Sequence, residues 1–204
     1  GCGTGGNFKY LFNDYNNLYG LEINSYAIEI AKINNPKANF IVGDANDFKK
    51  INITADLIIF LDVLYSKNII NVKDVLIKSR NHVKNNGYLL ISEPAFNFLK
   101  GKHSDSVNSL RRFNLKEMEK KITSCGYKII KSQYWGFSIF FFMFLKRYIF
   151  ERFSFKKTNN FHNEFLIPNS FNKIFFFLQK FELFISRKFK FPFGSSILIL
   201  AKKI

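Results

Sequence analysis

Gly1-Cys2-Gly3-Thr4-Gly5-Gly6 is the stretch that decides the fold of this chain. Glycines at alternate positions leave no Cβ where the backbone turns tightly from a strand into a helix, so a ligand can lie directly against the main chain. The stretch therefore predicts a nucleotide-type binding loop. Taken alone it is ambiguous, because it reads both as G-x-G-x-G and, with Gly6, as the dinucleotide fingerprint G-x-G-x-x-G.

The 204 residues correspond to one domain of ordinary size, and the 47% hydrophobic content argues against disorder. Because the chain begins on a glycine inside the motif, we interpret it as an N-terminally truncated fragment that lacks the strand expected before such a loop. The two cysteines, Cys2 and Cys125, are too few for a disulfide framework or a zinc site. We expect a reducing, cytoplasmic setting and no metal.

The formal net charge of +16 is compatible with binding to nucleic acid, because clustered lysines and arginines neutralise phosphates. A second explanation competes with it. Lys, Asn, Ile and Phe are all over-used in this chain, as biased codon composition produces, and such a bias scatters lysines over solvated faces. We favour this compositional explanation for the bulk of the charge.

Short apolar runs alternate with amphipathic stretches along the rest of the chain. A helix is expected from Asn7 to about Asn16, with its N-terminal amides pointing toward the ligand. Further helices are expected over residues 25–33, with Ser25 or Asn24 as the N-cap, and over 72–83 and 115–124. Strands are expected over residues 18–23, 40–42, 55–61, 88–92, 127–134 and 196–201. The run Ala55–Leu61, apolar apart from Asp56, is typical of a parallel strand covered on both faces.

Acidic residues lie at or just beyond the ends of three of these strands. Glu22 lies about 20 residues beyond the glycine loop, the separation at which a carboxylate meets the hydroxyls of a ribose. Asp44 ends the strand 40–42, where it could hydrogen-bond an adenine amino group or cap the next turn. Asp62 follows the strand 55–61 at its carboxyl end, where open α/β sheets bind their ligands.

These motifs, in this order, resemble the successive motifs of class I S-adenosylmethionine-dependent methyltransferases, in particular the type 11/12-like members. The resemblance covers roughly residues 1–135 and the terminal strand. It implies a Rossmann-like, doubly wound α/β sheet, mostly parallel with an antiparallel C-terminal strand, and S-adenosylmethionine as the cofactor. It also implies a cofactor site formed by Gly1, Cys2, Gly3, Gly5, Glu22, Ile23, Asp44, Ala45, Asp62 and Val63.

The acceptor site is expected after the strand 88–92. Methyl transfer is an in-line displacement, so positioning and desolvation supply most of the catalysis, and a hydroxyl acceptor must also lose a proton. The segment from Glu93 to Phe113 is similar to a subgroup that carries a His-Asp pair and an Arg-Arg-Tyr string. We expect catalytic roles for His103 and Asp62, and substrate contacts from Tyr65, Glu93, His103, Arg111 and Arg112. The alternative is that both arginines form a solvated patch and that His103 is a loop residue.

Residues 137–193 are rich in phenylalanine and basic. They hold nineteen of the twenty-seven phenylalanines and ten Lys or Arg against three Glu. The apolar run Phe137–Leu145 is too short to span a bilayer. Helical spacing of Phe171, Ile174, Phe175, Leu178, Phe181 and Ile185 predicts an amphipathic helix with basic residues at its edges. Such a helix can lid the acceptor pocket, dimerise, or lie on an anionic membrane.

We therefore predict a cofactor-binding core over residues 1–136, a Phe-rich basic helical insertion or lid over 137–193, and a last core strand within 194–204. The expected function is methyl transfer to an oxygen of an apolar, lipid-linked or glycan-type metabolite, in the cytoplasm or at the inner face of the membrane. One alternative is an RNA methyltransferase, which bulk charge alone favours, without a recognisable nucleic-acid module. The other is a non-catalytic basic membrane-binding module that keeps the fold.

Overall fold

A computed structural model shows the fold and describes residues 1–12, 14–15, 17–48, 51–100, 108–145, 148 and 169–204. Helices and strands alternate along most of this length. The helices are α1 (Gly6–Leu11), α2 (Ser25–Asn34), α3 (Val72–Asn81), α5 (Leu115–Ser124), α6 (Phe137–Leu145) and α8 (Asn169–Ile185), with a short 3-10 helix over Asn97–Leu99. The strands are β1 (Tyr19–Glu22), β2 (Asn39–Val42), β3 (Ala55–Leu61), β4 (Val83–Pro94), β5 (Tyr127–Trp135) and β6 (Ser196–Lys203).

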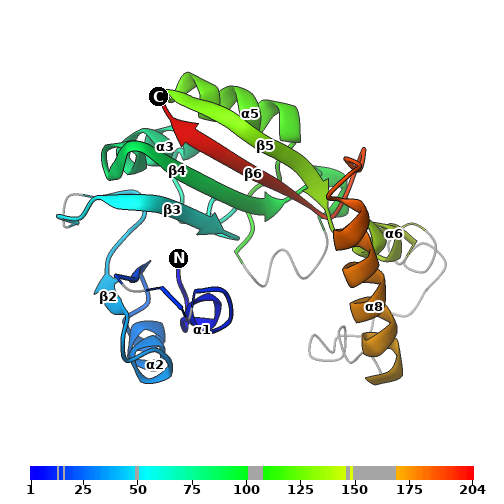
Figure 1. Cartoon of the computed structure of the whole chain (residues 1–204), viewed down its shortest axis with the longest axis horizontal. Coiled ribbons are helices and arrows are strands. Elements are labelled where there is room, and N and C mark those ends of the chain that lie inside the picture. Colours follow the sequence, from blue (N-terminus) through cyan, green and yellow to red (C-terminus); the bar gives the residue numbers. More distant parts are fainter. Residues whose placement is uncertain (13, 16, 49–50, 101–107, 146–147, 149–168) are drawn as a thin grey trace.

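The described strands form two sheets (Figure 1). Strands β1 and β2 pair in parallel, and the larger sheet has the order β3-β4-β6-β5. In the larger sheet β3 and β4 are parallel, whereas β6 is antiparallel to both of its neighbours. The predicted α/β class is confirmed, including the antiparallel C-terminal strand.

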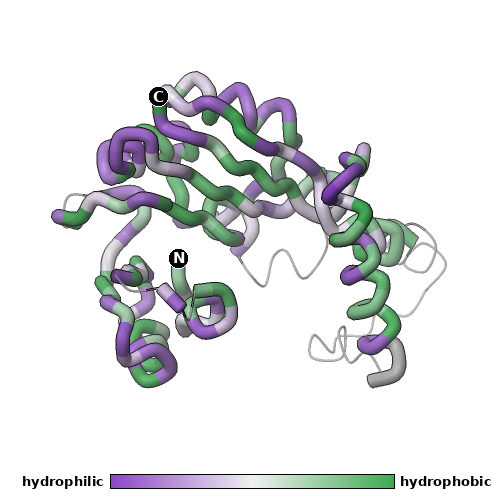
Figure 2. The backbone as a smooth tube through the Cα atoms, viewed as in Figure 1, coloured by the Kyte–Doolittle hydropathy of each residue, from purple (hydrophilic) through white to green (hydrophobic). Residues whose placement is uncertain are grey.

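The core lies where α3 and α5 pack on the larger sheet. Its fully buried side chains alternate along β4 and β6, as in Leu89 and Ile91 and in Ile197 and Ile199. The helices contribute Leu76, Met118 and Ile122 to the same cluster. Figure 2 shows this hydrophobic residue pattern along the central strands. Because every second residue of a strand points to the same face, this alternation is what buries one face of the sheet under the two helices.

Strand β3 is less covered than its sequence predicted. We expected the run Ala55–Leu61 to be buried on both faces, but Phe60 alone is buried and Leu57 is exposed. Among the described strands β3 pairs only with β4, so it forms an edge of the larger sheet. The run therefore predicted the position of the strand correctly, but the prediction that both of its faces are buried was wrong.

Some element ends also differ from the expected ones. Helix α1 ends at Leu11, earlier than predicted, whereas α5 begins and ends where we expected. The N-cap of α2 is Asn24, whose Oδ1 accepts hydrogen bonds from the N–H groups of Tyr26 and Ala27. Strand β4 begins at Val83, earlier than the expected residue 88. The added residues contain a bulge, because Ala55 and Leu57 of β3 pair with Val83 and Tyr88.

Within the described part of the Phe-rich region, helices α6 and α8 lie at one side of the larger sheet, on the side where β3 and β4 end (Figure 1). The chain then returns through β6, which lies between β4 and β5. None of the described helices is long and apolar enough to cross a membrane.

Candidate cofactor site

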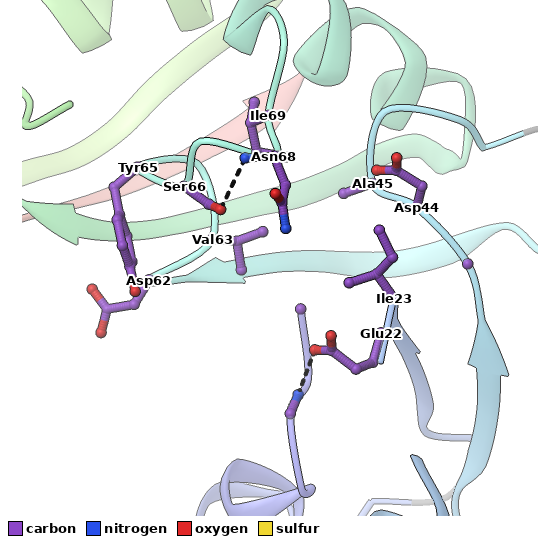
Figure 3. Close-up of a pocket in the computed structure, with 13 residues that line it drawn as sticks. Glu22, Ile23, Asp44, Ala45, Asp62, Val63, Tyr65, Ser66, Asn68 and Ile69 are labelled. Carbon is purple, nitrogen blue, oxygen red and sulfur yellow. Dashed lines mark hydrogen bonds between the residues drawn. The ribbon is translucent and has the colours of Figure 1, made fainter. Parts of the chain in front are cut away.

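One open cleft of about 210 Å³ lies where the carboxyl ends of β1, β2 and β3 meet the start of the chain. The structure therefore brings together residues that lie more than sixty positions apart in the sequence. Figure 3 shows Glu22 between Asp44 on one side and Asp62 with Tyr65 on the other. The cleft is lined by Gly1, Gly3, Glu22, Ile23, Gly43, Asp44, Ala45, Asp62, Val63, Tyr65, Ser66, Asn68 and Ile69.

The glycine loop crosses this cleft close to both sheets. The N–H of Cys2 donates to the carbonyl of Leu21 in β1 (3.0 Å), and a Cβ on Gly1 would lie 2.5 Å from Val63 Cγ2. Gly3 has a φ of 53° and open space where a Cβ would be. The backbone at Gly3 is thus accessible to a ligand from inside the cleft.

Glu22 lies at the end of β1 beside the loop. Its Oε2 accepts a hydrogen bond from the N–H of Gly3 (3.0 Å) and its Oε1 accepts one from the N–H of Asn24 (3.1 Å). Burial raises the pKa of the Glu22 carboxyl, but these two N–H groups, the positive charge of the Gly1 amino group and the N–H of Ile23 together outweigh burial, and the net pKa lies below its ordinary value. A carboxylate has about four lone-pair sites, so this anion still has acceptor capacity for two hydroxyl groups.

Asp44 and Asn46 connect the β2 side of the cleft to the loop after β3. Oδ1 of Asp44 accepts from both the backbone N–H and the side-chain amide of Asn46, each at 2.8 Å. The same amide donates to the carbonyl of Asn68 (2.7 Å), and its Oδ1 accepts from the N–H of Ile70 (3.0 Å). Asp44 therefore caps the following turn, as one of our two hypotheses held, while its Oδ2 accepts no hydrogen bond from the described residues.

Asp62 follows β3 at the opposite end of the cleft. Its φ of 55° is in the left-handed region, which is uncommon for a residue with a side chain. Burial raises the pKa of the Asp62 carboxyl, and the positive charge of Arg112 acts in the opposite direction. Burial also raises the pKa of the neighbouring Tyr65 hydroxyl, and the charges of Asp62 and Glu93 add to this effect. The two side chains form a partly desolvated polar pair.

Glu93 lies behind this loop and does not line the cleft. It is fully buried, and its carboxylate accepts hydrogen bonds from the N–H groups of Val63 (3.0 Å), Leu64 (2.7 Å) and Tyr65 (3.1 Å). Burial raises the pKa of Glu93 to about 8, against the opposite effect of these donors. We predicted that Glu93 contacts the substrate, but its carboxylate is instead bonded to the backbone that carries Asp62 and Tyr65.

The two arginines also bind backbone near the cleft. Arg111 Nη2 donates to the carbonyl of Ile69 (2.7 Å), and Arg112 Nη1 donates to the carbonyl of Ala95 (3.2 Å). Both side chains are half-buried, so the alternative of a solvated patch is wrong. His103 lies outside the described residues.

Most of the residues predicted for cofactor binding thus share one cleft, whereas Cys2 and Gly5 lie in the loop without lining it. Gly5 instead begins α1 with a φ of 78°, and a Cβ there would lie 2.5 Å from Asn35 Nδ2. Sequence reasoning missed Ser66, Asn68 and Ile69, although they follow Asp62 in the same loop. It also missed Asn46, which nothing in the sequence distinguished from the many other asparagines.

An adenosyl cofactor fits this cleft on three observations: the open backbone at Gly3, the acceptor capacity of Glu22, and the available Oδ2 of Asp44. The fold and the site together define an α/β protein of the Rossmann-like class with a nucleotide-type cleft at the carboxyl ends of its strands. Residues 1–91 match the methyltransferase domain family. This match, which covers somewhat less than half of the chain, and the fold together support a class I S-adenosylmethionine-dependent methyltransferase, whose cofactor is S-adenosylmethionine.

Solved structures with the same fold are distant in sequence. A chain of the complex between the Haloferax volcanii Trm112 methyltransferase activator and a methyltransferase is 14% identical, with a TM-score of 0.63 over 99% of this chain and 79% of that one. A Clostridium acetobutylicum S-adenosylmethionine-dependent methyltransferase is 14% identical, with a TM-score of 0.58 over 99% and 81%. The cyclase SpnF is 14% identical, with a TM-score of 0.63 over 100% and 72%. None of the curated proteins matches the sequence.

Proposed function

We propose that this protein transfers a methyl group from S-adenosylmethionine to an oxygen of an apolar small molecule. The observation that carries the proposal is the gathering of Glu22, Asp44 and Asp62, from three successive strand ends, around the backbone of the glycine loop. When bound, the cofactor supplies an electrophilic sulfonium methyl group. Glu22 would hold the ribose hydroxyls, and Asp44 with Ala45 would hold the adenine.

The surroundings of Asp62 suit proton removal from a hydroxyl acceptor. Burial raises the pKa of its carboxyl, which makes the anion a better proton acceptor than an exposed aspartate. Tyr65, from the same loop, offers a hydroxyl next to it (Figure 3). Glu93 holds both residues in place through the backbone N–H groups of this loop. We expect Asp62, with His103, to act on the acceptor.

An aromatic cluster after β4 supports an apolar acceptor. Phe96, immediately beyond the end of β4, stacks on Tyr134 with ring centroids 5.0 Å apart and on Phe98 at 5.2 Å. Phe140 of α6 meets the edges of Phe96 and Phe98 at 5.9 and 6.1 Å. Aromatic rings near a reacting centre desolvate large apolar molecules, and a lipid-linked or glycan-type metabolite provides such a molecule with a free hydroxyl.

The test has a binding step and a transfer step. Isothermal titration calorimetry with S-adenosylmethionine should give saturable binding, and incubation with methyl-labelled cofactor and a lipid extract should move label into an organic-soluble product. Asp62→Asn should lose far more of the transfer than of the cofactor binding. Failure of the wild-type protein to bind the cofactor would favour the non-catalytic module. Label in total RNA rather than in lipid would favour the RNA methyltransferase.

Between these alternatives the cleft itself favours a small molecule. Its described lining includes three carboxylates, those of Glu22, Asp44 and Asp62, and no lysine or arginine. A polyanionic RNA strand entering this cleft would meet like charge, whereas RNA-binding surfaces present clustered cations. The bulk charge of +16 therefore gives little support to RNA methylation at this site.

A further inference from the structure

Helix α8 buries a carboxylate and a hydroxyl and exposes most of its large apolar side chains. Glu182 and Ser186 are buried, and Phe175 and Gln179, from the same side, are half-buried. These four positions are spaced i, i+4, i+7 and i+11, which places them on one helical face. The other faces carry large exposed apolar side chains, namely Ile174, Phe176, Phe177, Leu178, Phe181, Leu183 and Phe184. A surface helix of a water-soluble domain normally has the opposite orientation.

Glu182 fixes this orientation. Its carboxylate accepts hydrogen bonds from the N–H groups of Phe137 (2.7 Å) and Ser138 (3.1 Å) and from the Ser138 hydroxyl (3.0 Å). An anion at a helix N-terminus satisfies unpaired donors and favours the helix dipole. Because Glu182 must face the start of α6, the apolar residues on the opposite side of α8 must face outward. Their exposure is therefore a consequence of a specific contact.

Helix α6 also exposes large apolar side chains. It packs against α8 through Phe142 and Phe175, whose ring centroids are 5.1 Å apart. Phe141, Phe144 and Leu145 of α6 are exposed, and so is Tyr148 shortly after the end of the helix. Together with the exposed residues of α8 they form the α6–α8 surface, where Figure 2 shows hydrophobic residues on both helices. An exposed apolar area of several neighbouring aromatic residues marks an interaction site.

A row of cations crosses this surface. Lys173, Lys180 and Arg187 recur every seventh residue, so they lie along one line of the helix, and all three are exposed. Lys180 Nζ lies 4.7 Å from the centroid of the Phe176 ring. From Asn169 to Lys190 the chain has one acidic residue, and this is the buried Glu182. Among the described residues of α6 and α8, the surface therefore combines bulky apolar groups with positive charge and exposes no carboxylate.

We propose that the α6–α8 surface docks on an anionic phospholipid membrane. Phenylalanine and leucine side chains insert at the boundary between headgroups and acyl chains, and lysines and arginines contact anionic headgroups. A second copy of the chain fits less well, because a symmetric α8 pair would bring the two cationic rows together without acidic partners. Docking here would hold the aromatic cluster at Phe96 close to the lipid, since Phe140 of α6 contacts that cluster.

Vesicle flotation tests this proposal without any catalytic assay. The full chain should float with vesicles that contain phosphatidylglycerol, should fail to float with pure phosphatidylcholine, and should detach at high salt. Lys173→Gln/Lys180→Gln/Arg187→Gln should lower partitioning about a hundredfold, since each cation near an anionic surface contributes about fivefold. Phe177→Ser/Phe184→Ser should lower it about tenfold or more through lost apolar burial.

Tyr26→Ser/Ile33→Ser is the matched control, because both residues are exposed apolar side chains of α2 on another side of the molecule (Figure 1). This variant should float like the wild type. The proposal is overturned if the wild type does not float with anionic vesicles, if it floats equally with neutral ones, or if the control loses as much binding as the α8 variants. It is also overturned if sedimentation shows a dimer that Phe177→Ser/Phe184→Ser converts to a monomer. If Phe177→Ser/Phe184→Ser does not fold, the flotation of Lys173→Gln/Lys180→Gln/Arg187→Gln tests the proposal instead.

Discussion

At the scale of single residues, Glu22 joins the glycine loop to the proposed ribose site. Both of its oxygens accept one backbone N–H, which orients the carboxylate toward the cleft. We predict that Glu22→Ala weakens S-adenosylmethionine affinity about tenfold, through the loss of charge-assisted hydrogen bonds to the ribose. Calorimetric titration measures this change. Glu29→Ala removes an exposed carboxylate of α2 and should leave the affinity unaltered, and equal affinities in all three proteins would remove Glu22 from the site.

Glu93 supports a prediction about pH. In the unfolded chain its carboxyl ionises near the ordinary pKa of 4.5, whereas burial raises the pKa to about 8 in the folded protein. Between these values the folded state holds the extra proton, so the free energy of unfolding contributed by this group falls as the pH rises. Glu93→Gln cannot ionise and should show a smaller decrease between about pH 5 and pH 8.

Urea denaturation of both proteins at the two pH values measures the difference. Glu29→Gln serves as the control, because Glu29 is an exposed member of a surface ion pair. It should keep the pH dependence of the wild type. A Glu93→Gln protein with the same slope as the wild type would show that Glu93 ionises at its ordinary pKa in the folded state.

At the scale of elements, sequence patterns predicted which strands and helices form better than which of their faces are buried. The acidic residues after β1, β2 and β3 could be placed in one cleft because parallel strands end at the same edge. The orientation of α8 could not be predicted, because its apolar residues recur around most of the helix and the contact between Glu182 and α6 is a tertiary one. The exposure of β3 depends in the same way on neighbours that its own residues do not specify.

The start of α6 provides the prediction at this scale. Glu182→Ala removes the acceptor of three hydrogen bonds and leaves the N–H groups of Phe137 and Ser138 without it. We expect a local destabilisation of about 1–3 kcal/mol, since buried donors then lose their partner. Hydrogen exchange should quicken in α6 and α8 and stay unchanged in α3 and α5. If the variant exchanged faster than the wild type in all four helices alike, the role of Glu182 would not be confined to the α6–α8 contact.

At the scale of the whole molecule, the cleft lies between two sheets that share no strand pairing among the described residues. Several contacts hold its walls together, and two of them involve Gly1 and Asn46. Gly1 packs against Val63, and Asn46 bonds the β2 side to the backbone of the loop after β3. Because the proposed cofactor contacts come from both sides, affinity should depend on how firmly these walls are joined.

Asn46 provides the most direct test of this dependence, because it is not among the residues that line the cleft. Asn46→Ala removes its bonds to Asp44, Asn68 and Ile70, and the expected result is S-adenosylmethionine affinity lowered about tenfold with an unchanged far-UV spectrum. Asn85→Ala, at an exposed position in the β4 bulge, is the matched control. If both variants bind the cofactor like the wild type, the walls keep their spacing without the Asn46 side chain, and the remaining contacts, such as the packing of Gly1 on Val63, suffice to form the site.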